Sequence, residues 1–238
     1  MYLYSDNMGI LSHTKTDGKP NYDYEWRRPV NTEYFDGTNG SAWFNQLGEV
    51  EVGGSATRGF AQKTLKLFAN KRFGTKRFNG VLWEEKPDVK KVKSFLLRNG
   101  GNFSPNSRLN DALVQRISGT GMSNLDYQAY DGVIVYINGE YKGIYGLRER
   151  SNDNYVEANF GIEDIFYATH LSYLPSGDTE RKESTFSEVY DVYTGSNATF
   201  EKMENLIDVD NFMKAMIAEM YSTNRDYPDN NVWKISVG

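Results

Sequence analysis

The sequence contains no cysteine, which excludes disulfide bonds, thiol catalysis and zinc sites built from cysteine. Histidine is almost as scarce. The two histidines, His13 and His170, lie far apart and have no cluster of other metal-binding residues beside them. We therefore expect isolated polar histidines rather than a histidine-based metal site.

Long apolar runs and an excess of basic residues are also missing. The longest apolar run, Val133 to Ile137, is far too short to cross a bilayer, and the first residues lack the basic-then-apolar pattern of a signal peptide. The net charge of −5 argues against a general nucleic-acid binder, which would be basic. These absences predict no transmembrane segment, and either a cytosolic protein or a piece of a longer one.

Bulky core material is present, because the 238 residues include 13 Phe, 17 Tyr and 4 Trp. The length suits one large domain or two small lobes. Alternating or apolar segments between turn residues predict strands in the first half of the chain. These segments are Val30–Phe35, Gly48–Val52, Lys63–Phe68 and Lys93–Arg98, with the glycine-rich turn Gly53–Gly59 between the second and the third.

A β-hairpin is the clearest local prediction. The segments Gly132–Ile137 and Glu140–Leu147 flank Asn138-Gly139, the dipeptide typical of a type I′ turn. In the third strand, Leu65 and Leu67 are predicted on one face and Lys66 on the other.

Helices are predicted mainly in the second half. Leu109, Leu113 and Ile117 recur every four residues before Gly119, which we expect to end that helix. Ser151 is predicted to cap a short helix that ends at Gly161. The last helix begins near Asp208 and Asp210. Its apolar stripe, which we expect to be core, consists of Phe212, Met213, Met216, Ile217 and Met220.

Strands followed by helices predict an α+β fold. We expect a single kinase-like domain over residues 1–238, with a β-rich lobe over about 25–149, including the hairpin at about 131–149, and a helical lobe over 150–238. Sheet lobe first and helical lobe second is the order of a protein kinase.

The loop after the last helix has the spacing of a kinase catalytic loop. Arg225-Asp226 is followed by four residues and then Asn231. In R-D-x-x-x-x-N the acid lies beside the acceptor hydroxyl and the amide binds a metal ion. Taken alone, the same residues also fit a plain surface turn, because Pro228 and Asp229-Asn230 favour turns.

Several stretches together resemble the CotH (spore coat protein H) kinase family over roughly residues 25–235. The resemblance is carried by Gly53 to Leu67, by Phe95 to Gly101, by the hairpin Tyr136 to Glu149, and by Asp210-Asn-Phe with Asn224 to Asn231. Each motif is short, but four of them in the right order make the resemblance specific.

The resemblance implies an atypical protein kinase of secreted or surface proteins, with an ATP- and metal-dependent transfer of phosphate to Ser or Thr. The metal would be Mg²⁺ or Mn²⁺. By position, Asp226 would accept the hydroxyl proton and Asn231 would hold metal. The predicted nucleotide-binding residues are Gly53, Gly54, Arg58 and Lys63 at the phosphates, Tyr145 at the adenine, and Glu149 paired with Lys63 or facing the nucleotide.

The sequence departs from the family pattern in three places. Val52 replaces a histidine common before the paired glycines, and Phe103 follows Asn102 where the family has Asp. After Asn231 a kinase needs a further metal-binding Asp, but the remaining residues to Gly238 contain no acid. We therefore expect this chain to be inactive or impaired as it stands, and to be part of a longer multidomain surface protein.

Alternatives remain open at this point. Lys63 could be an ordinary strand-edge lysine, Gly53-Gly54 a plain hairpin turn, and Glu149 a member of a surface ion pair. The whole domain could be a non-catalytic interaction module that kept a kinase-like fold. A carbohydrate- or cell-wall-binding domain is a third possibility. Its mark would be Trp26, Trp43 or Trp83 exposed in a row beside Asp or Asn, and burial of all three would count against it.

Overall fold

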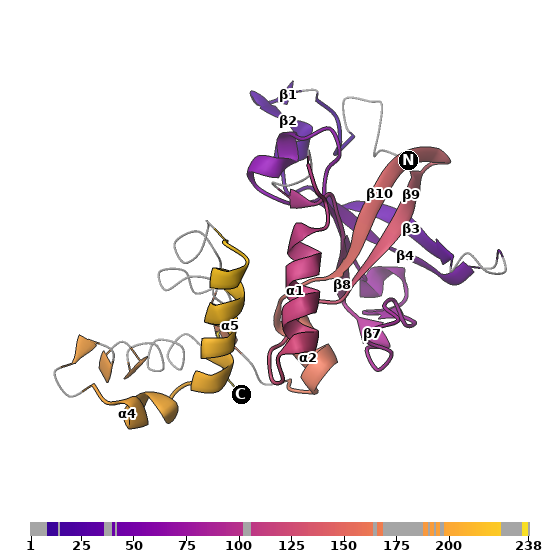
Figure 1. The fold of residues 1–238 in the computed structure, drawn as a ribbon. Helices are drawn as coiled ribbons and strands as arrows, with labels where there is room; N and C mark the ends of the chain where they lie inside the picture. Colours follow the sequence, from indigo (N-terminus) through magenta and orange to yellow (C-terminus); the bar gives the residue numbers. More distant parts are fainter. Residues whose placement is uncertain are drawn as a thin grey trace. The chain divides into compact units, whose positions relative to one another are not determined.

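The computed structural model describes residues 9–13, 15–35, 40, 42–101, 106–163, 166–168, 188–189, 191–192, 194–195, 198–224 and 235–237. The chain divides into two compact units. The first comprises Met1–Leu113 and Gln128–Asn159, and the second comprises Val114–Tyr127 and Phe160–Gly238. Figure 1 shows their helices and strands along the chain.

A six-stranded antiparallel sheet is the main element of the first unit (Figure 1). In sheet order its strands are β3 (Arg28–Phe35), β4 (Ala42–Val52), β5 (Leu65–Phe68), β8 (Ser94–Arg98), β10 (Glu140–Glu149) and β9 (Tyr130–Ile137). The sheet curls, so that β3 and β9, its two edge strands, line one cavity. A sheet in the N-terminal part and helices toward the C-terminus confirm the predicted α+β fold.

Short elements fill the connections of the sheet. They are the strand pairs β1 (Lys15–Thr16) with β2 (Lys19–Pro20) and β6 (Phe78–Asn79) with β7 (Lys91–Val92), and the 3₁₀ turns η1 (Asn21–Asp23), η2 (Ala56–Gly59) and η3 (Lys71–Phe73). The turn η2 belongs to the predicted glycine-rich turn. Lys63 was predicted to lie in the strand after this turn. That strand begins at Leu65, so Lys63 precedes it.

The predicted hairpin is confirmed. Asn138 and Gly139 both have positive φ, as a type I′ turn requires, and they join β9 to β10. The predicted alternation in β5 is also confirmed, because Leu65 and Leu67 are buried while Lys66 reaches the opposite face.

The core of the first unit lies against the inner face of the sheet. Phe78 packs on Phe95 and Phe44 with ring centroids 4.9 and 5.8 Å away. Trp83 is fully buried, and its indole N–H donates to the carbonyl of Leu147 at 2.9 Å. Trp83 has no exposed surface, but Trp43 is exposed, so the burial of all three tryptophans that would count against a carbohydrate-binding domain is not found.

Along the chain, one helix follows strand β8 and a second follows strand β10. Helix α1 (Asn110–Gly121) continues through Gly119, so the prediction that Gly119 ends it was wrong. A Cβ at Gly119 would come within 2.1 Å of the Tyr127 ring, and this close approach explains the glycine. Helix α2 (Asp153–Phe160) ends before Gly161 as predicted, but its cap is Asn152, whose side chain accepts from the Tyr155 amide at 3.1 Å. The prediction of Ser151 as the cap was therefore off by one residue.

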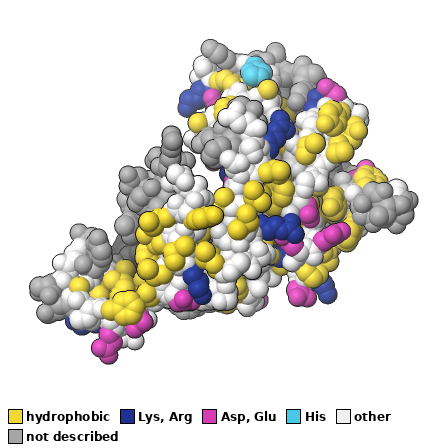
Figure 2. Space-filling view, viewed as in Figure 1, with side chains coloured by type: hydrophobic (Ala, Val, Ile, Leu, Met, Phe, Trp, Pro, Cys, Tyr) yellow, Lys and Arg dark blue, Asp and Glu magenta, His cyan; other side chains and the backbone are white. Residues whose placement is uncertain are grey.

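The second unit contains α4 (Phe200–Glu204), α5 (Val209–Tyr221) and the strand pair β11 (Phe166–Ala168) with β12 (Ile235–Val237). Asp208 caps α5 by accepting from the Asn211 amide at 2.9 Å, as predicted. The apolar stripe of α5 was predicted to be core, yet Met213, Ile217 and Met220 are at least half exposed, and Figure 2 shows hydrophobic side chains gathered over this helix. Within the described residues, no helix has the length and apolarity needed to span a membrane.

Candidate functional site

The predicted phosphate-binding glycines form a tight, self-contained turn. Gly53 donates its amide to the Thr64 carbonyl at 2.8 Å, and a Cβ on it would crowd the side chains of Thr64 and Lys66. Gly54 has φ of +95°, and a Cβ there would lie 2.4 Å from the Thr57 hydroxyl. Both positions therefore require glycine for the backbone turn itself.

Arg58 closes this turn from one side. Its Nε donates to the Gly54 carbonyl at 2.7 Å and its Nη1 to the Asp23 carbonyl at 2.8 Å, while Nη2 lies 3.5 Å from Glu25. The guanidinium group thus joins the glycine turn to the 3₁₀ turn η1. Most of its donors are used within the fold.

Lys63 is buried beside the same turn, with 4% of its surface exposed. Its ammonium group donates to the Phe60 carbonyl at 2.8 Å and lies 4.0 Å from the centre of the Tyr22 ring. Burial lowers the pKa of Lys63, and the carboxylate of Asp23 opposes this shift only in part.

Glu149 lies at the end of β10 and is also buried. Its carboxylate accepts from Lys86 at 2.7 Å, from the Asn159 side chain at 2.8 Å and from the Ala129 amide at 2.7 Å. The structure therefore pairs Glu149 with Lys86 and not with Lys63. The proposed surface ion pair is also not what is found, because this pair is buried.

Tyr145, the predicted adenine contact, lines a cavity of about 490 Å³. Three arginines line the same cavity: Arg98 from the end of β8, Arg108 from the segment before α1, and Arg148 from β10. The remaining lining residues include Tyr130, Gly100, Gly146 and one carboxylate, Asp111. We call this space the arginine cavity.

The arginine cavity carries more positive than negative charge. Arg148, with 1% of its surface exposed, binds Asp111 through both terminal nitrogens at 2.7 and 3.2 Å, and Arg98 lies 3.1 Å from the same carboxylate. Three guanidinium groups thus face a single carboxylate. The Nε of Arg148 is buried without a hydrogen-bond partner.

Burial shifts the pKa values of two residues that line the arginine cavity, Arg148 and Tyr130. It lowers the pKa of Arg148, although the Asp111 carboxylate opposes the shift. It raises the pKa of the Tyr130 hydroxyl, and Arg148 and Arg108 oppose that rise. A second negative charge in the cavity would offset the free-energy cost of burying the guanidinium groups, so the arrangement favours an anion.

The glycine turn and the arginine cavity share a supporting backbone group. The Ile144 carbonyl accepts from Gln62 at 2.8 Å and from Arg108 at 3.2 Å. The fully buried Asn99 then links the two segments, because it donates to the Gln62 carbonyl and accepts from the amide of Gly101. The sequence segments Gly53–Leu67 and Phe95–Gly101 therefore meet around Gln62 and Asn99.

The predicted base Asp226 and metal ligand Asn231 lie outside the described residues, and their roles stay predictions. Among the residues that the structure does describe, no group of three His, Asp or Glu side chains could hold a metal ion.

Sequence reasoning missed Arg98, Arg108, Arg148 and Asp111. Two of the four stood inside segments already singled out, because Arg98 precedes Asn99 and Arg148 precedes Glu149. The available signal was strand alternation: Leu97 and Leu147 face the core, so Arg98 and Arg148 must face the other side of the sheet.

Comparison with known proteins bears directly on this site. A search of curated proteins finds no match. The family model described as CotH kinase protein matches residues 50–235, well over half of the chain, and this range includes the glycine turn, the arginine cavity and the segment with Asp226 and Asn231. The chain belongs to the CotH kinase protein family.

Proposed function

We propose that this chain is the phosphotransferase domain of an atypical protein kinase, which binds ATP with its phosphates in the arginine cavity. The observation that supports this proposal is the cavity itself, because three guanidinium groups and one carboxylate line it, which leaves an excess of positive charge. Its volume of about 490 Å³ is within the range of small-molecule sites.

Arginine suits this role because its planar donors bind phosphate oxygens in pairs. Arg108 is exposed at the surface and would meet an incoming phosphate first. Arg98 keeps donors available, since its described contact is one terminal nitrogen on Asp111. Tyr130, the cross-strand partner of Arg148, supplies a flat, partly apolar wall for the rest of the nucleotide, whereas the Tyr145 ring is buried in the core.

The chemistry is assigned through the family. Asp226 accepts the proton of the attacking Ser or Thr hydroxyl, and Asn231 holds Mg²⁺ or Mn²⁺, which supplies neutralisation of phosphate charge when bound. We propose that the substrate is a secreted or cell-surface protein and that the domain works at that location. In this transfer the Ser or Thr oxygen forms a bond to the terminal phosphorus of ATP. The bond between that phosphorus and the bridging oxygen breaks, and ADP leaves.

Titration with a fluorescent ATP analogue in the presence of Mg²⁺ or Mn²⁺ tests nucleotide binding. We expect Arg98→Met and Arg108→Met each to weaken binding at least tenfold, because each removes a charge-assisted contact of about 1.5–3 kcal/mol. Lys76→Met, which removes one exposed positive charge elsewhere on the first unit, is the matched control and should bind normally.

Phosphoryl transfer is tested separately with radiolabelled ATP and a mixture of surface proteins. In a C-terminally extended form, where we expect transfer to be measurable, Asp226→Ala should keep nucleotide affinity and lose transfer. If the chain and a C-terminally extended form both fail to bind nucleotide, the proposal is wrong and the interaction-module alternative takes its place.

A further inference from the structure

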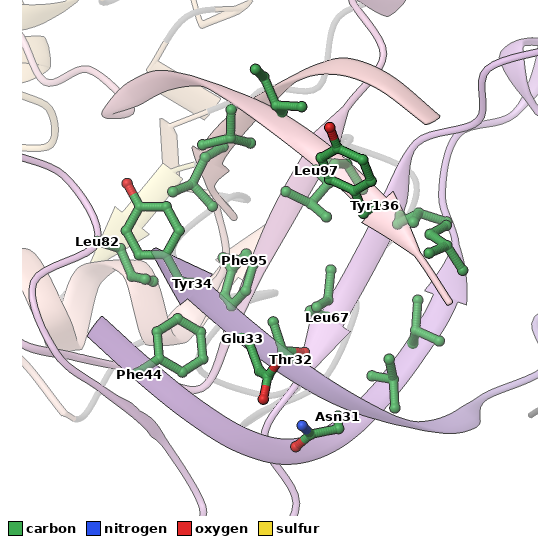
Figure 3. Close-up of a pocket in the computed structure, with 18 of the residues that line it drawn as sticks. Asn31, Thr32, Glu33, Tyr34, Phe44, Leu67, Leu82, Phe95, Leu97 and Tyr136 are labelled. Atoms are coloured by element: carbon green, nitrogen blue, oxygen red, sulfur yellow. The ribbon is translucent and has the colours of Figure 1, made fainter. Parts of the chain in front are cut away.

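A second cavity lies inside the curled sheet, on the face opposite the arginine cavity. It has a volume of about 180 Å³, and both edge strands of the sheet line it, β3 with residues 30–34 and β9 with residues 133–137. Figure 3 shows Thr32 on one side and Tyr136 on the other, with Leu67 and Phe95 between them. We call it the inner cavity.

The inner cavity and the arginine cavity share no lining residue, although they use the same strands. Leu97 and Leu147, which are cross-strand partners, face the inner cavity. Their neighbours Arg98 and Arg148 face the arginine cavity. Because successive side chains of a strand point to opposite faces, the inner cavity lies on one face of the sheet and the arginine cavity on the other.

The walls of the inner cavity are mainly apolar. They come from all six strands of the sheet, and the residues that form the floor are Val50, Leu65, Leu67, Phe95, Leu97 and Leu147. In an engineered protein, an apolar cavity of about 150 Å³ stays dry and binds benzene. A cavity of this size and lining therefore has room for one aromatic ring.

Thr32 is one of the polar residues in this lining, which also includes Asn31, Glu33 and Asn138. Thr32 is on the β3 side, and its hydroxyl oxygen is buried without a hydrogen-bond partner. A buried hydroxyl without a partner destabilises the protein by about 1–3 kcal/mol. A bound molecule that supplies the missing hydrogen bond would remove this cost.

We propose that the inner cavity binds a small apolar molecule, about the size of one aromatic ring, that carries a single hydrogen-bonding group directed at the Thr32 hydroxyl. The apolar walls supply most of the affinity, and Thr32 selects for the polar group. This site is separate from the proposed phosphotransfer site and does not depend on it.

Phenol and toluene test the proposal, because they have nearly the same shape and differ in one hydroxyl. Saturable binding to the full chain is measured by NMR titration and by the rise in the temperature of thermal unfolding. We expect both molecules to bind the unmodified chain, and phenol to bind about fivefold more tightly through a hydrogen bond of about 1 kcal/mol.

Thr32→Val removes the hydroxyl and keeps the shape. It should abolish the preference for phenol and leave toluene binding unchanged, whereas Thr75→Val, at an exposed threonine, should leave both unchanged. Val133→Phe, which fills the inner cavity, should abolish both. Absence of saturable binding by either molecule overturns the proposal, and so does an undiminished phenol preference in Thr32→Val.

Discussion

The glycine turn around Arg58 and Lys63 and the arginine cavity are two basic regions of the same unit, and they use their charge differently. In the turn, Arg58 and Lys63 donate to backbone carbonyls of neighbouring segments. In the cavity, Arg98 and Arg148 share the single carboxylate of Asp111. The cations of the glycine turn hold neighbouring backbone segments together, while the arginine cavity keeps an excess of positive charge.

This difference shows that the position of a basic residue beside glycines does not decide its role. A donor that already has a buried carbonyl partner must give up that bond before it can bind a ligand. An arginine that shares a carboxylate with a second arginine gains from another anion instead. Each of the four predictions below compares the two regions.

The largest effect is expected for Arg148→Met. Removing this buried guanidinium group deletes both of its hydrogen bonds to the Asp111 carboxylate, so we expect stability to fall by about 3 kcal/mol. Urea unfolding at neutral pH measures this loss, and titration with the fluorescent ATP analogue should show binding reduced at least tenfold.

The double variant Arg148→Met with Asp111→Asn separates the two effects. It also removes the charge of the carboxylate that Arg148 binds, and should recover part of the stability without recovering nucleotide binding. Because the double variant restores the net charge of the cavity, recovery of binding would show that this net charge, rather than the Arg148 guanidinium group itself, binds the nucleotide.

Glu51→Gln tests the support beneath the glycine turn. Glu51 accepts from Lys66 at 2.8 Å and from Arg27 at 3.0 Å, and the stem of Lys66 packs against Gly53. Burial raises the pKa of Glu51, but the hydrogen bonds from Lys66 and Arg27 outweigh it, so the pKa lies below its usual 4.5. We expect the variant to lose about 2 kcal/mol of stability at neutral pH.

The pH dependence of this loss has a definite sign. Because the pKa of Glu51 is lower in the folded than in the unfolded chain, its contribution is fully present above 4.5 and is lost as the pH falls through the folded value. Unfolding experiments should therefore show the stability difference between Glu51→Gln and the unmodified chain narrowing as the pH falls below 4.5. A gap that stays constant would mean that the carboxylate charge contributes nothing.

The first-half fold could be predicted from the sequence because its signals are local. Asn138-Gly139 determines the hairpin turn, and the alternation of Leu65, Lys66 and Leu67 determines which face of β5 is buried. Caps were less certain. Asn152 and Ser151 are both good capping residues, and only the backbone geometry selects Asn152.

The site was harder to predict because its contacts join distant segments. Glu149 was predicted to pair with Lys63 or to face the nucleotide, but its partner Lys86 comes from the segment between β6 and β7, which no periodicity marks. Asp111 is likewise brought to Arg148 by the start of α1. Such pairings depend on tertiary packing, which single-sequence patterns do not encode.

Arg108→Met and Arg58→Met form a matched pair, one from each region. Arg108 is exposed at the cavity, so its loss should lower stability by less than about 0.5 kcal/mol and weaken nucleotide binding at least tenfold. Arg58 closes the glycine turn, so its loss should cost about 1 kcal/mol and leave binding unchanged. Parallel measurement of thermal unfolding and nucleotide affinity checks both, and the opposite pattern would assign the phosphates to the glycine turn.

The smallest effect, and the one with the most informative sign, is expected for Lys63→Met. Burial lowers the pKa of Lys63 in the folded chain below 10.5, so the cost of burying its charge is fully present below that lowered value. The cost disappears as the pH rises toward 10.5, where the unfolded chain also releases the proton. Replacing the ammonium group with an apolar side chain should therefore raise stability at neutral pH by about 1 kcal/mol or less, and the gain should shrink in alkaline solution. Nucleotide affinity should stay within about twofold, because the Lys63 ammonium group already donates to the Phe60 carbonyl and lies over Tyr22. If the variant instead lost nucleotide binding with Arg148 intact, Lys63 would be the phosphate partner that the sequence motif predicts, and the two regions would share the ligand.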